Sequence, residues 1–329
     1  MSDAPPPPRF ALHWAAATDR TFPGEIQEGL AAVRKSIPSH YFYDDLGSSL
    51  FEAICHLPEY YPTRAETELL RRHAGDIAMA AGGPVRIIEL GSGSARKTRL
   101  LLDQVTGDGS KIEYVPVDID PHMLEKSGRE LLAEYPSLRV TAVCADFTQP
   151  SRALAGLPRS GRTLALFLGS TIGNFQPRPA AALLRDLKRR LEPGDTILLG
   201  ADLKKAPEVL NQAYNDALGV TAAFNLNLLQ RINRELGGRF DLRTFAHRAF
   251  YDPDQGRIEM HLVSLREQRV HIDSLGTAVS FTEGETIHTE NSYKYDDADL
   301  ARMAADAGLA IEERWTDSRK WFTDVMFRV

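Results

Sequence analysis

The feature that most restricts the fold of this chain is a regular alternation of short apolar segments with longer amphipathic segments between residues 85 and 200. Five segments have the length and composition of buried strands: Val85–Leu90, Ile112–Val117, Leu138–Cys144, Thr163–Leu168 and Thr196–Gly200. The spacing of apolar residues predicts helices between them, at Arg96–Val105, Pro121–Ala133 and Pro179–Leu191. Because strands that alternate with helices join into a parallel sheet, the pattern predicts a doubly wound, Rossmann-like α/β fold.

The segments on either side do not continue this alternation. Helices are predicted before it at 22–37, 48–55 and 63–80, and after it over 209–234. Strand-like segments then follow at 244–251, 257–265, 270–272 and 286–295. Consecutive strands of this kind pair as antiparallel hairpins, so we expect a second, α+β unit beside the main sheet. After a helix at 297–307, a last strand at 321–329 is expected to return to the first sheet as an antiparallel edge strand.

Composition excludes several classes of protein. The net charge is −6 and no basic block is present, so a nucleic-acid partner is not expected. The longest apolar runs are far shorter than the roughly 20 residues of a membrane-spanning helix, and the N-terminus lacks a signal-peptide pattern. The chain has two cysteines, Cys55 and Cys144, which are too few for a disulfide framework or a cysteine-rich zinc site. Its scattered histidines have no metal-ligand spacing. We therefore expect a cytoplasmic monomer without a metal.

A glycine-containing loop follows the first predicted strand, in the segment Glu89-Leu90-Gly91-Ser92-Gly93-Ser94. Glycines at this place let a ligand approach the backbone at the carboxyl end of a parallel sheet. The third glycine of a dinucleotide fingerprint is replaced by Arg96, so the loop is an incomplete match to that fingerprint. A glycine pair alone is a weak signal, and a generic tight turn is the alternative explanation of the loop.

Acidic residues end the next two predicted strands. Asp118 is suited to accept hydrogen bonds from both hydroxyls of a ribose, and Asp146-Phe147 offers a carboxylate and a ring to an adenine. Glu89 would repel a pyrophosphate but attract the ammonium group of a methionine-like ligand. Each carboxylate alone is compatible with a solvated loop. Together they favour S-adenosylmethionine over a nicotinamide dinucleotide.

A second candidate site is rich in tyrosine. The segments Tyr41–Ser48 and Pro58–Arg64 combine rigid aromatic faces with hydroxyl groups, which suits a small polar ligand, although an aromatic lid on the core is the simpler alternative. Gly169–Phe175 follows the fourth predicted strand, where a substrate amine would meet a methyl group. Within it, Asn174 is able to hold a carboxylate or a neutral amine, or to cap the next helix.

Five separated motifs, in this order, resemble the histidine-specific N-alpha-methyltransferases of ergothioneine biosynthesis. They are Tyr60-Tyr61-Pro62-Thr63-Arg64-Ala65-Glu66, Glu89-Leu90-Gly91-Ser92-Gly93, Gly169-Ser170-Thr171-Ile172-Gly173-Asn174-Phe175, Gly219-Val220-Thr221-Ala222-Ala223-Phe224-Asn225 and Thr289-Glu290-Asn291-Ser292. The similarity extends from about Pro23 to Val329. Five motifs in a fixed order are far more specific than a single glycine loop.

The resemblance implies an activity and a domain organisation. The activity is transfer of three methyl groups from S-adenosylmethionine to the alpha-amino group of L-histidine, which gives hercynine. The implied organisation is a disordered tail over 1–11, a substrate-binding accessory domain over 12–63 plus 205–294, and a methyltransferase domain over 64–204 plus 295–329.

The resemblance also assigns roles to individual residues. Asn174 and Tyr214 would hold the carboxylate of histidine, and Glu290 and Ser292 its imidazole. The other residues expected around the amino acid are Tyr43, Phe51, Tyr60, Gly169 and Met260, with Tyr43 and Asn174 closest to the chemistry. The residues expected at the cofactor are Gly91, Ser92, Gly93, Lys97, Asp118, Asp146 and Phe147, with Lys97 on the methionyl carboxylate.

The residues themselves support a histidine site but leave alternatives open. Glu290 and Ser292 are two apart on a predicted strand, so their side chains point to the same face and can grip one imidazole. Alternatively, Glu290 is a cross-strand partner of a surface cation such as Lys294. A related N-methyltransferase of an indole amino acid is the nearest rival function. A cofactor-binding regulator without turnover and a dehydrogenase are more distant alternatives.

Overall fold

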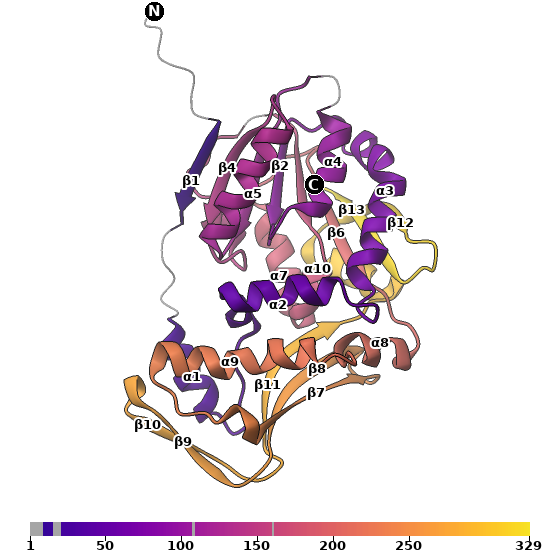
Figure 1. The fold of residues 1–329 in the computed structure, drawn as a ribbon. Helices are drawn as coiled ribbons and strands as arrows, with labels where there is room; N and C mark the ends of the chain where they lie inside the picture. Colours follow the sequence, from indigo (N-terminus) through magenta and orange to yellow (C-terminus); the bar gives the residue numbers. More distant parts are fainter. Residues whose placement is uncertain (1–8, 16–20, 107–108, 160) are drawn as a thin grey trace, which may run out of the picture.

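The computed structural model describes residues 9–15, 21–106, 109–159 and 161–329. A central sheet has the strand order β1-β4-β3-β2-β5-β6-β13-β12 (Figure 1). Its strands are β1 (Phe10–Trp14), β2 (Arg86–Leu90), β3 (Glu113–Asp118), β4 (Arg139–Cys144), β5 (Thr163–Phe167), β6 (Thr196–Asp202), β12 (Ala310–Thr316) and β13 (Phe322–Arg328). β1 to β6 pair in parallel, and β13 runs antiparallel to its neighbours β6 and β12. The predicted doubly wound α/β fold is confirmed.

The order of the strands creates a crevice at the carboxyl ends of β2 and β5. From β2 the chain proceeds to β3 on one side and later to β5 on the other, so the direction of winding reverses between them. Ligands of open α/β sheets bind at such a reversal. The loops that follow β2, β3, β4 and β5 therefore all face one candidate site.

Helices cover both faces of the sheet. Those of the whole described chain are α1 (Phe22–Ala31), α2 (Asp45–Cys55), α3 (Pro62–Ala80), α4 (Arg96–Val105), α5 (Pro121–Glu134), α6 (Pro150–Ala153), α7 (Pro177–Lys188), α8 (Pro207–Tyr214), α9 (Val220–Leu236) and α10 (Asp297–Ala307). Apolar residues of α3, α4 and α5 share one buried cluster with the sheet, and those of α7 and α10 share another. Every residue of β2, β5 and β6 is buried, as a sheet covered on both faces requires.

The C-terminal strand is antiparallel, as predicted, but it is not an edge strand. β13 lies between β6 and β12, and its residues Phe322–Phe327 are buried. The outer strand β12 escaped prediction because five of its seven residues are exposed, so it lacks the apolar pattern of a buried strand. Its place is set by pairing with β13.

The accessory part contains a three-stranded antiparallel sheet in the order β11-β8-β7, and a hairpin of β9 and β10. Its strands are β7 (Phe245–Asp252), β8 (Arg257–Ser264), β9 (Gln268–Ile272), β10 (Thr277–Phe281) and β11 (Thr286–Tyr293). Helix α9 packs against this sheet, and α2 packs against α9 (Figure 1). The predicted α+β unit is therefore present, with β10 as a strand that the sequence analysis missed.

The N-terminal segment corrects the predicted tail and the predicted start of the accessory domain. Phe10–Trp14 forms β1, which pairs in parallel with β4 at the edge of the central sheet. The Arg9 side chain also donates to three carbonyl groups near the end of α5. A five-residue edge strand gains its stability from this pairing, which local sequence does not reveal. The rest of the predicted tail, residues 1–8, lies outside the described residues; the remaining domain boundaries stay a prediction.

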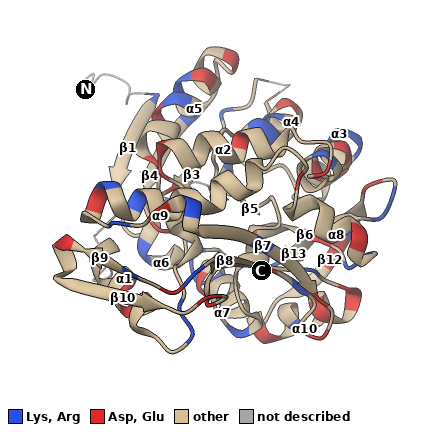
Figure 2. Ribbon diagram, turned by 60° about the horizontal axis from the view of Figure 1, so that its bottom comes forward, with Lys and Arg blue, Asp and Glu red and all other residues tan. Residues whose placement is uncertain are grey.

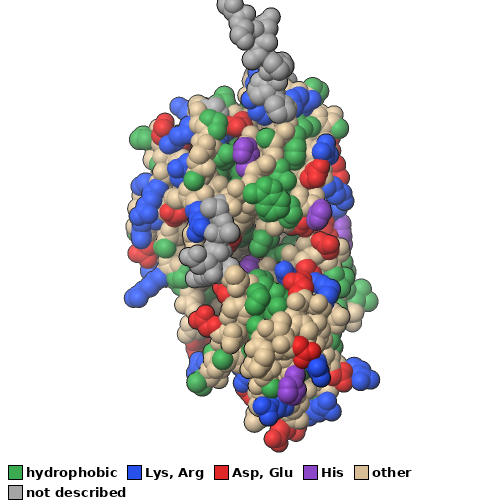
Figure 3. Space-filling model, turned by 90° about the vertical axis from the view of Figure 1, so that its left-hand side faces the viewer, with side chains coloured by type: hydrophobic (Ala, Val, Ile, Leu, Met, Phe, Trp, Pro, Cys, Tyr) green, Lys and Arg blue, Asp and Glu red, His purple; other side chains and the backbone are tan. Residues whose placement is uncertain are grey.

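The surface matches the mixed composition of the chain. Figure 2 shows Lys and Arg residues interspersed with Asp and Glu residues along the outer helices α5 and α10. On the face shown in Figure 3, the surface is hollowed where the central α/β part meets the accessory part. None of the helices in the described part of the chain has both the length and the apolar composition needed to cross a bilayer.

Candidate active site

A cavity with about 410 Å³ of space free of protein atoms lies where the two parts of the molecule meet. Its walls come from five stretches of chain that are far apart in sequence. The lining residues are Tyr43, Phe51, Tyr60, Pro62, Gly169, Ser170, Thr171, Asn174, Asp202, Tyr214, Glu290, Ser292 and Lys294. The structure thus brings together all but one of the predicted catalytic and substrate-binding residues.

The exception is Met260, which is not among the lining residues. It lies on β8 directly opposite Glu290 of β11 and is 2% exposed, as part of the accessory core. The structure therefore places Met260 in support of the strand that carries Glu290.

An irregularity in β11 aims Glu290 at the cavity. His288 pairs with His261, and Glu290 pairs with Met260, so Thr289 is an extra residue in β11. The Thr289 hydroxyl donates to the Met260 carbonyl oxygen at 3.0 Å. Such a bulge shifts the alternation of side chains by one residue. Beyond it, Glu290, Ser292 and Lys294 follow at two-residue spacing, and all three line the cavity.

The carboxyl group of Glu290 is unusually basic. Burial raises its pKa to about 7, and the nearby Lys294 only partly opposes that shift. Lys294 does not form an ion pair with Glu290. It is buried and pairs instead with Asp202, so the alternative of a surface cross-strand pair is wrong. Near neutral pH, Glu290 is poised to accept a hydrogen bond from a donor that enters the cavity.

One wall of the cavity is aromatic. The ring centroids of Tyr43 and Phe51 are 5.6 Å apart, those of Phe51 and Tyr60 are 6.2 Å apart, and those of Tyr60 and Tyr214 are 6.1 Å apart, all in edge-to-face contact. Burial raises the pKa of both Tyr43 and Tyr60 well above the usual value, so both keep their phenolic hydrogens. Such a wall is suited to enclose a small cation whose charge is surrounded by apolar groups.

Helix α2 holds Phe51 in this wall. Asp44 caps the helix by accepting a hydrogen bond from the Gly47 N–H at 2.7 Å. A Cβ atom at position 47 would lie 1.7 Å from the carbonyl oxygen of Phe42, so only glycine fits at this tight start. The sequence Tyr43–Gly47 therefore sets the direction in which the helix leaves the aromatic segment.

The loop after β5 forms another wall. Gly169 has a φ of +77° and Ser170 a φ of +56°, both in the left-handed region. The Gly169 N–H donates to the buried carboxylate of Glu66 at 2.7 Å. Asn174 ends this loop and faces the cavity, whereas Gln176 is the residue at the start of α7. The alternative in which Asn174 caps the next helix is therefore wrong.

The glycine loop after β2 adopts the backbone shape that its sequence suggested. Gly91 and Gly93 have φ values of +69° and +46°. The Gly93 N–H donates to Asp118 at 2.9 Å, which joins the loop to the end of β3. A Cβ atom at Gly91 would lie 3.4 Å from the ring of Phe147, so the residue after β4 reaches the same place.

Two groups in this region have the character of a ligand site. Burial raises the pKa of Asp118, although the Gly93 and Asp120 N–H groups favour its charged form. The buried hydroxyl oxygen of Ser92 has no hydrogen-bond partner among the described residues. A buried orphan of this kind is usually satisfied by a ligand or by water. The open backbone at Gly93, where a Cβ atom would meet nothing within 4 Å, leaves room for such a ligand.

The remaining predicted cofactor residues are held by protein partners. Asp146 accepts a hydrogen bond from the Thr148 N–H at 2.9 Å. Lys97 forms an ion pair with the buried Glu66. Glu89 is 3% exposed and accepts hydrogen bonds from Thr98 and Tyr114. The Glu89 carboxylate is buried and bonded to protein groups, so the structure does not support the expected direct contact with a ligand ammonium group.

The chain matches the family model described as "Histidine-specific methyltransferase, SAM-dependent" over residues 22–329. The chain belongs to this family. A histidine N-alpha-methyltransferase of Mycolicibacterium smegmatis is 44% identical over 293 residues, which cover 89% of this chain and 90% of that protein. The Mycobacterium tuberculosis protein of the same name is 43% identical with the same coverage.

A more distant relative bears on the choice of substrate. An L-tryptophan methyltransferase of Psilocybe serbica is 28% identical over 319 residues, which cover 89% of each protein. The predicted indole alternative thus corresponds to an existing enzyme, but this enzyme is less similar to the chain than the histidine N-alpha-methyltransferases are. Membership of the histidine-specific methyltransferases confirms the predicted enzyme class, its S-adenosylmethionine dependence and its histidine substrate class.

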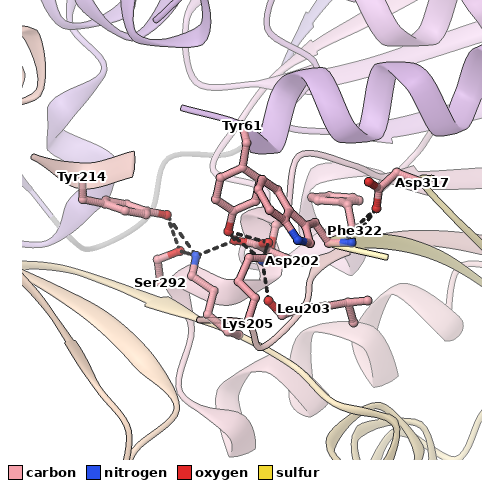
Figure 4. A network of polar contacts seen from close by, with 11 residues as sticks. Tyr61, Asp202, Leu203, Lys205, Tyr214, Ser292, Asp317 and Phe322 are labelled. Carbon is pink, nitrogen blue, oxygen red and sulfur yellow. Dashed lines mark hydrogen bonds and ion pairs between the residues drawn. The ribbon is translucent and has the colours of Figure 1, made fainter. Parts of the chain in front are cut away.

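This histidine-specific methyltransferase also contains a buried charge network that the sequence analysis missed. Asp202, at the end of β6, is fully buried and accepts hydrogen bonds from the Tyr61 hydroxyl at 2.7 Å and from Lys205 at 2.5 Å (Figure 4). The Lys294 Nζ atom lies 2.9 Å from Asp202 Oδ2, the oxygen that also accepts from Tyr61. Although burial opposes ionisation, the two lysines hold the pKa of Asp202 below its usual value.

Two patterns in the sequence could have revealed this network. Asp202 follows the fifth predicted strand, just as Asp118 and Asp146 follow the second and third. Lys294 continues the two-residue spacing of Glu290 and Ser292, which places it on the same face. Both patterns were visible, but neither residue type by itself indicates burial.

Proposed function

We propose that this chain transfers three methyl groups, one after another, from S-adenosylmethionine to the alpha-amino nitrogen of L-histidine and so forms hercynine. One observation carries the proposal: Glu290 and Ser292 from the accessory sheet and Asn174 from the loop after β5 line a single cavity. An acidic group, a hydroxyl group and an amide in one small cavity match the imidazole and the amino-acid group of histidine.

Glu290 and Ser292 recognise the imidazole ring in this proposal. A carboxylate accepts the ring N–H, and a hydroxyl group pairs with the second ring nitrogen. Analogues without these ring nitrogens would leave both protein groups buried and unpaired, which strongly disfavours their binding. An indole has one N–H and a larger ring, so it makes poor use of the pair.

Asn174 donates its amide N–H to the carboxylate, while the Tyr214 hydroxyl group, whose hydrogen goes to Ser292, only borders that end of the cavity, and the aromatic wall surrounds the amine. Before each transfer the amine must lose a proton to water, because only its neutral form has a lone pair. Tyr43 remains a neutral hydroxyl because burial raises its pKa, so it orients this lone pair by hydrogen bonding rather than acting as a strong base. Positioning supplies most of the catalysis. The growing cationic head is stabilised by the faces of Tyr43 and Phe51.

The loop after β2 fits S-adenosylmethionine, whose sulfonium supplies an electrophilic methyl group when it is bound. Gly91, Ser92 and Gly93 would accommodate the methionyl part against their backbone and the free Ser92 hydroxyl group. Asp118 would accept the ribose hydroxyls. Asp146 and Phe147 would contact the adenine. Lys97, which forms an ion pair with Glu66, would also contact the methionyl carboxylate.

The same proposal includes the setting of the reaction. The chain acts in the cytoplasm as a monomer on a free amino acid, without a nucleic-acid or membrane partner and without a metal. Support comes from its net charge of −6 and from the mixture of acidic and basic side chains along its outer helices (Figure 2).

Mass spectrometry and calorimetry test the activity. Incubation with L-histidine and S-adenosylmethionine should yield products heavier by one, two and three methyl groups. Titration with L-histidine should release or absorb heat, while L-tryptophan should give much weaker binding. Absence of binding to histidine would refute the substrate, and cofactor binding without any methylated product would indicate a regulator.

A further inference from the structure

Lys294 lines the cavity and is almost completely buried, with 1% of its side chain exposed. Its ammonium nitrogen is 2.7 Å from the Ser292 hydroxyl oxygen, 3.1 Å from the Tyr214 hydroxyl oxygen and 2.9 Å from an oxygen of Asp202. An ammonium group has three hydrogens and no acceptor. All three hydrogens are therefore engaged by protein atoms, and Lys294 acts on a ligand through the hydroxyl groups that it contacts.

This arrangement restricts the hydroxyl hydrogens of Tyr214 and Ser292. Both oxygens must accept a hydrogen bond from Lys294. They also lie 2.7 Å from each other, so one hydroxyl donates to the other. Of the two hydroxyl hydrogens, one bridges the pair and the other is left for the cavity. A phenol is a better donor than an alcohol, so Tyr214 donates to Ser292. The remaining hydrogen is then that of Ser292.

We propose that Lys294 is a positioning residue that turns Ser292 into a hydrogen-bond donor toward the substrate ring, so that the site selects a neutral imidazole with a bare nitrogen at Ser292 and an N–H at Glu290. The inference rests on the proposed function of the cavity. It goes further by stating the proton positions on the bound ring and the residue that dictates them.

The charges around Asp202 keep Lys294 protonated and in contact with Ser292 and Tyr214. Lys294 contacts one oxygen of the carboxylate, Oδ2, and Lys205 contacts the other, Oδ1. Asp202 raises the pKa of Lys294 against the effect of burial, so Lys294 stays protonated and cannot accept a hydrogen bond. Burial lowers the pKa of Lys205 to about 8, and the contacts of Lys205 are with Asp202, Tyr61 and the Leu203 carbonyl group. Only Lys294 of these two residues reaches the hydroxyl pair.

This asymmetry provides a matched pair of variants. Lys294→Met and Lys205→Met each remove one buried cation from Asp202 and leave it the other as a counterion. The measurement is the ratio of affinities for L-histidine and for the two pyrrolylalanine isomers, in which a carbon replaces one or the other ring nitrogen. The unmodified enzyme should prefer histidine by about tenfold to a hundredfold, because the pyrroles leave the Ser292 hydrogen unpaired.

In Lys294→Met, the Ser292 oxygen keeps the hydrogen bond from Tyr214 but regains a free lone pair that can accept a pyrrole N–H, so the preference for histidine should fall at least fivefold. Lys205→Met should keep the preference within twofold. Both variants should bind S-adenosylmethionine within twofold of the unmodified enzyme. An unchanged preference in Lys294→Met, or an equal fall in both variants, would overturn the assignment.

A measurement on the unmodified enzyme stands even if a variant does not fold. Nitrogen-15 NMR of ring-labelled L-histidine, bound together with S-adenosylhomocysteine at pH 7.5, should show one protonated and one bare ring nitrogen. Two protonated nitrogens would contradict the donor role of Ser292. If the unmodified enzyme fails to bind histidine, the proposed function itself is wrong, which is a different outcome from histidine binding with the wrong ring protonation.

Discussion

The two halves of the active site hold their acidic residues in different ways. On the cofactor side, Asp118 accepts hydrogen bonds from the Gly93 and Asp120 N–H groups, and Asp146 from the Thr148 N–H. On the amino-acid side, Asp202 is held by side chains that come from distant elements, namely Tyr61, Lys205 and Lys294. Asp118 and Asp146 are thus held by backbone N–H groups near strand ends, whereas Asp202 is held by a network of buried side chains.

This difference has energetic consequences. A carboxylate that is held by backbone N–H groups at the rim of a sheet can be replaced without leaving another charge unpaired. In a buried network, loss of one member strands its partners in a medium of low polarity, where an unpaired charge is costly. Substitution of Asp118 or Asp146 should therefore be tolerated structurally and weaken only ligand binding, whereas substitution of Asp202 should reduce stability as well.

The largest effect is expected for Asp202→Ala. The substitution leaves Lys205 and Lys294 buried side by side without a counterion, which should reduce the free energy of unfolding by about 3–5 kcal/mol. Asp118→Ala removes a carboxylate that contacts only backbone N–H groups in the described structure, and should cost about 1 kcal/mol. Urea unfolding of both variants measures the difference. Equal losses would show that the two halves are held in the same way.

The next effect is a crossover in ligand binding between two variants. Glu290→Ala removes the acceptor for the imidazole and should weaken L-histidine binding by about a hundredfold, with S-adenosylmethionine binding nearly unchanged. Asp118→Ala should do the reverse, because its carboxylate serves the ribose. Calorimetric titration of each variant with each ligand gives four affinities.

The crossover has an internal control. Glu290→Gln keeps the size of the side chain and one acceptor oxygen, so it should recover part of the histidine affinity that alanine loses. If both ligands weaken equally in Glu290→Ala, the glutamate supports folding rather than histidine recognition.

The same contrast explains which parts of the molecule could be predicted from sequence. The parallel strands, the glycine loop and Asp118 follow from local patterns, because a strand end in a parallel sheet fixes where its next residues lie. The shared location of Glu290 and Asn174 was anticipated through the five motifs. Burial of Asp202 and Lys294 was not, because it depends on side chains that meet only after both parts have folded.

The strands that escaped prediction have the same explanation. β12 is mostly exposed and is positioned by its pairing with β13, while β1 is positioned by its pairing with β4. Both lie at the edges of the central sheet, where a strand needs neither a continuous apolar run nor strict alternation. Local periodicity identifies strands that are buried on both faces far better than strands of this kind.

A smaller effect concerns pH and Glu290. The pKa of Glu290 is about 7 in the folded chain, against an ordinary value of 4.5. A buried acid with a raised pKa destabilises the fold at pH values where the unfolded chain would be ionised. This penalty is absent below about pH 4.5, grows between about pH 4.5 and 7, and levels off above pH 7. Glu290→Gln removes the penalty and should therefore stabilise the ligand-free enzyme by about 3 kcal/mol at pH 8 but by less than about 1 kcal/mol at pH 5.

Urea unfolding of the unmodified enzyme and of Glu290→Gln at pH 5 and pH 8 measures this dependence. The difference between the two proteins should increase with pH. A difference that is the same at both values would mean that Glu290 is not the group that titrates. Asp118→Asn serves as a comparison from the cofactor half. Burial also raises the pKa of Asp118, so its difference should change in the same direction.

The smallest effect is expected where the two halves touch at the surface. Arg96, at the start of α4, lies 3.4 Å from Glu52 and 3.1 Å from His56 of the α2 region, and its side chain is 61% exposed. Exposed ion pairs contribute about 0–1 kcal/mol, so Arg96→Ala should change the free energy of unfolding by less than about 0.5 kcal/mol. Affinity for S-adenosylmethionine and for L-histidine should each change less than threefold by calorimetry. A tenfold loss of cofactor affinity would show that α2 forms part of the cofactor site, since Glu52 also accepts a hydrogen bond from Ser94 of the glycine loop at 3.2 Å. In that case α2 would contribute to both halves of the active site, with Phe51 facing the amino acid and Glu52 supporting the cofactor loop.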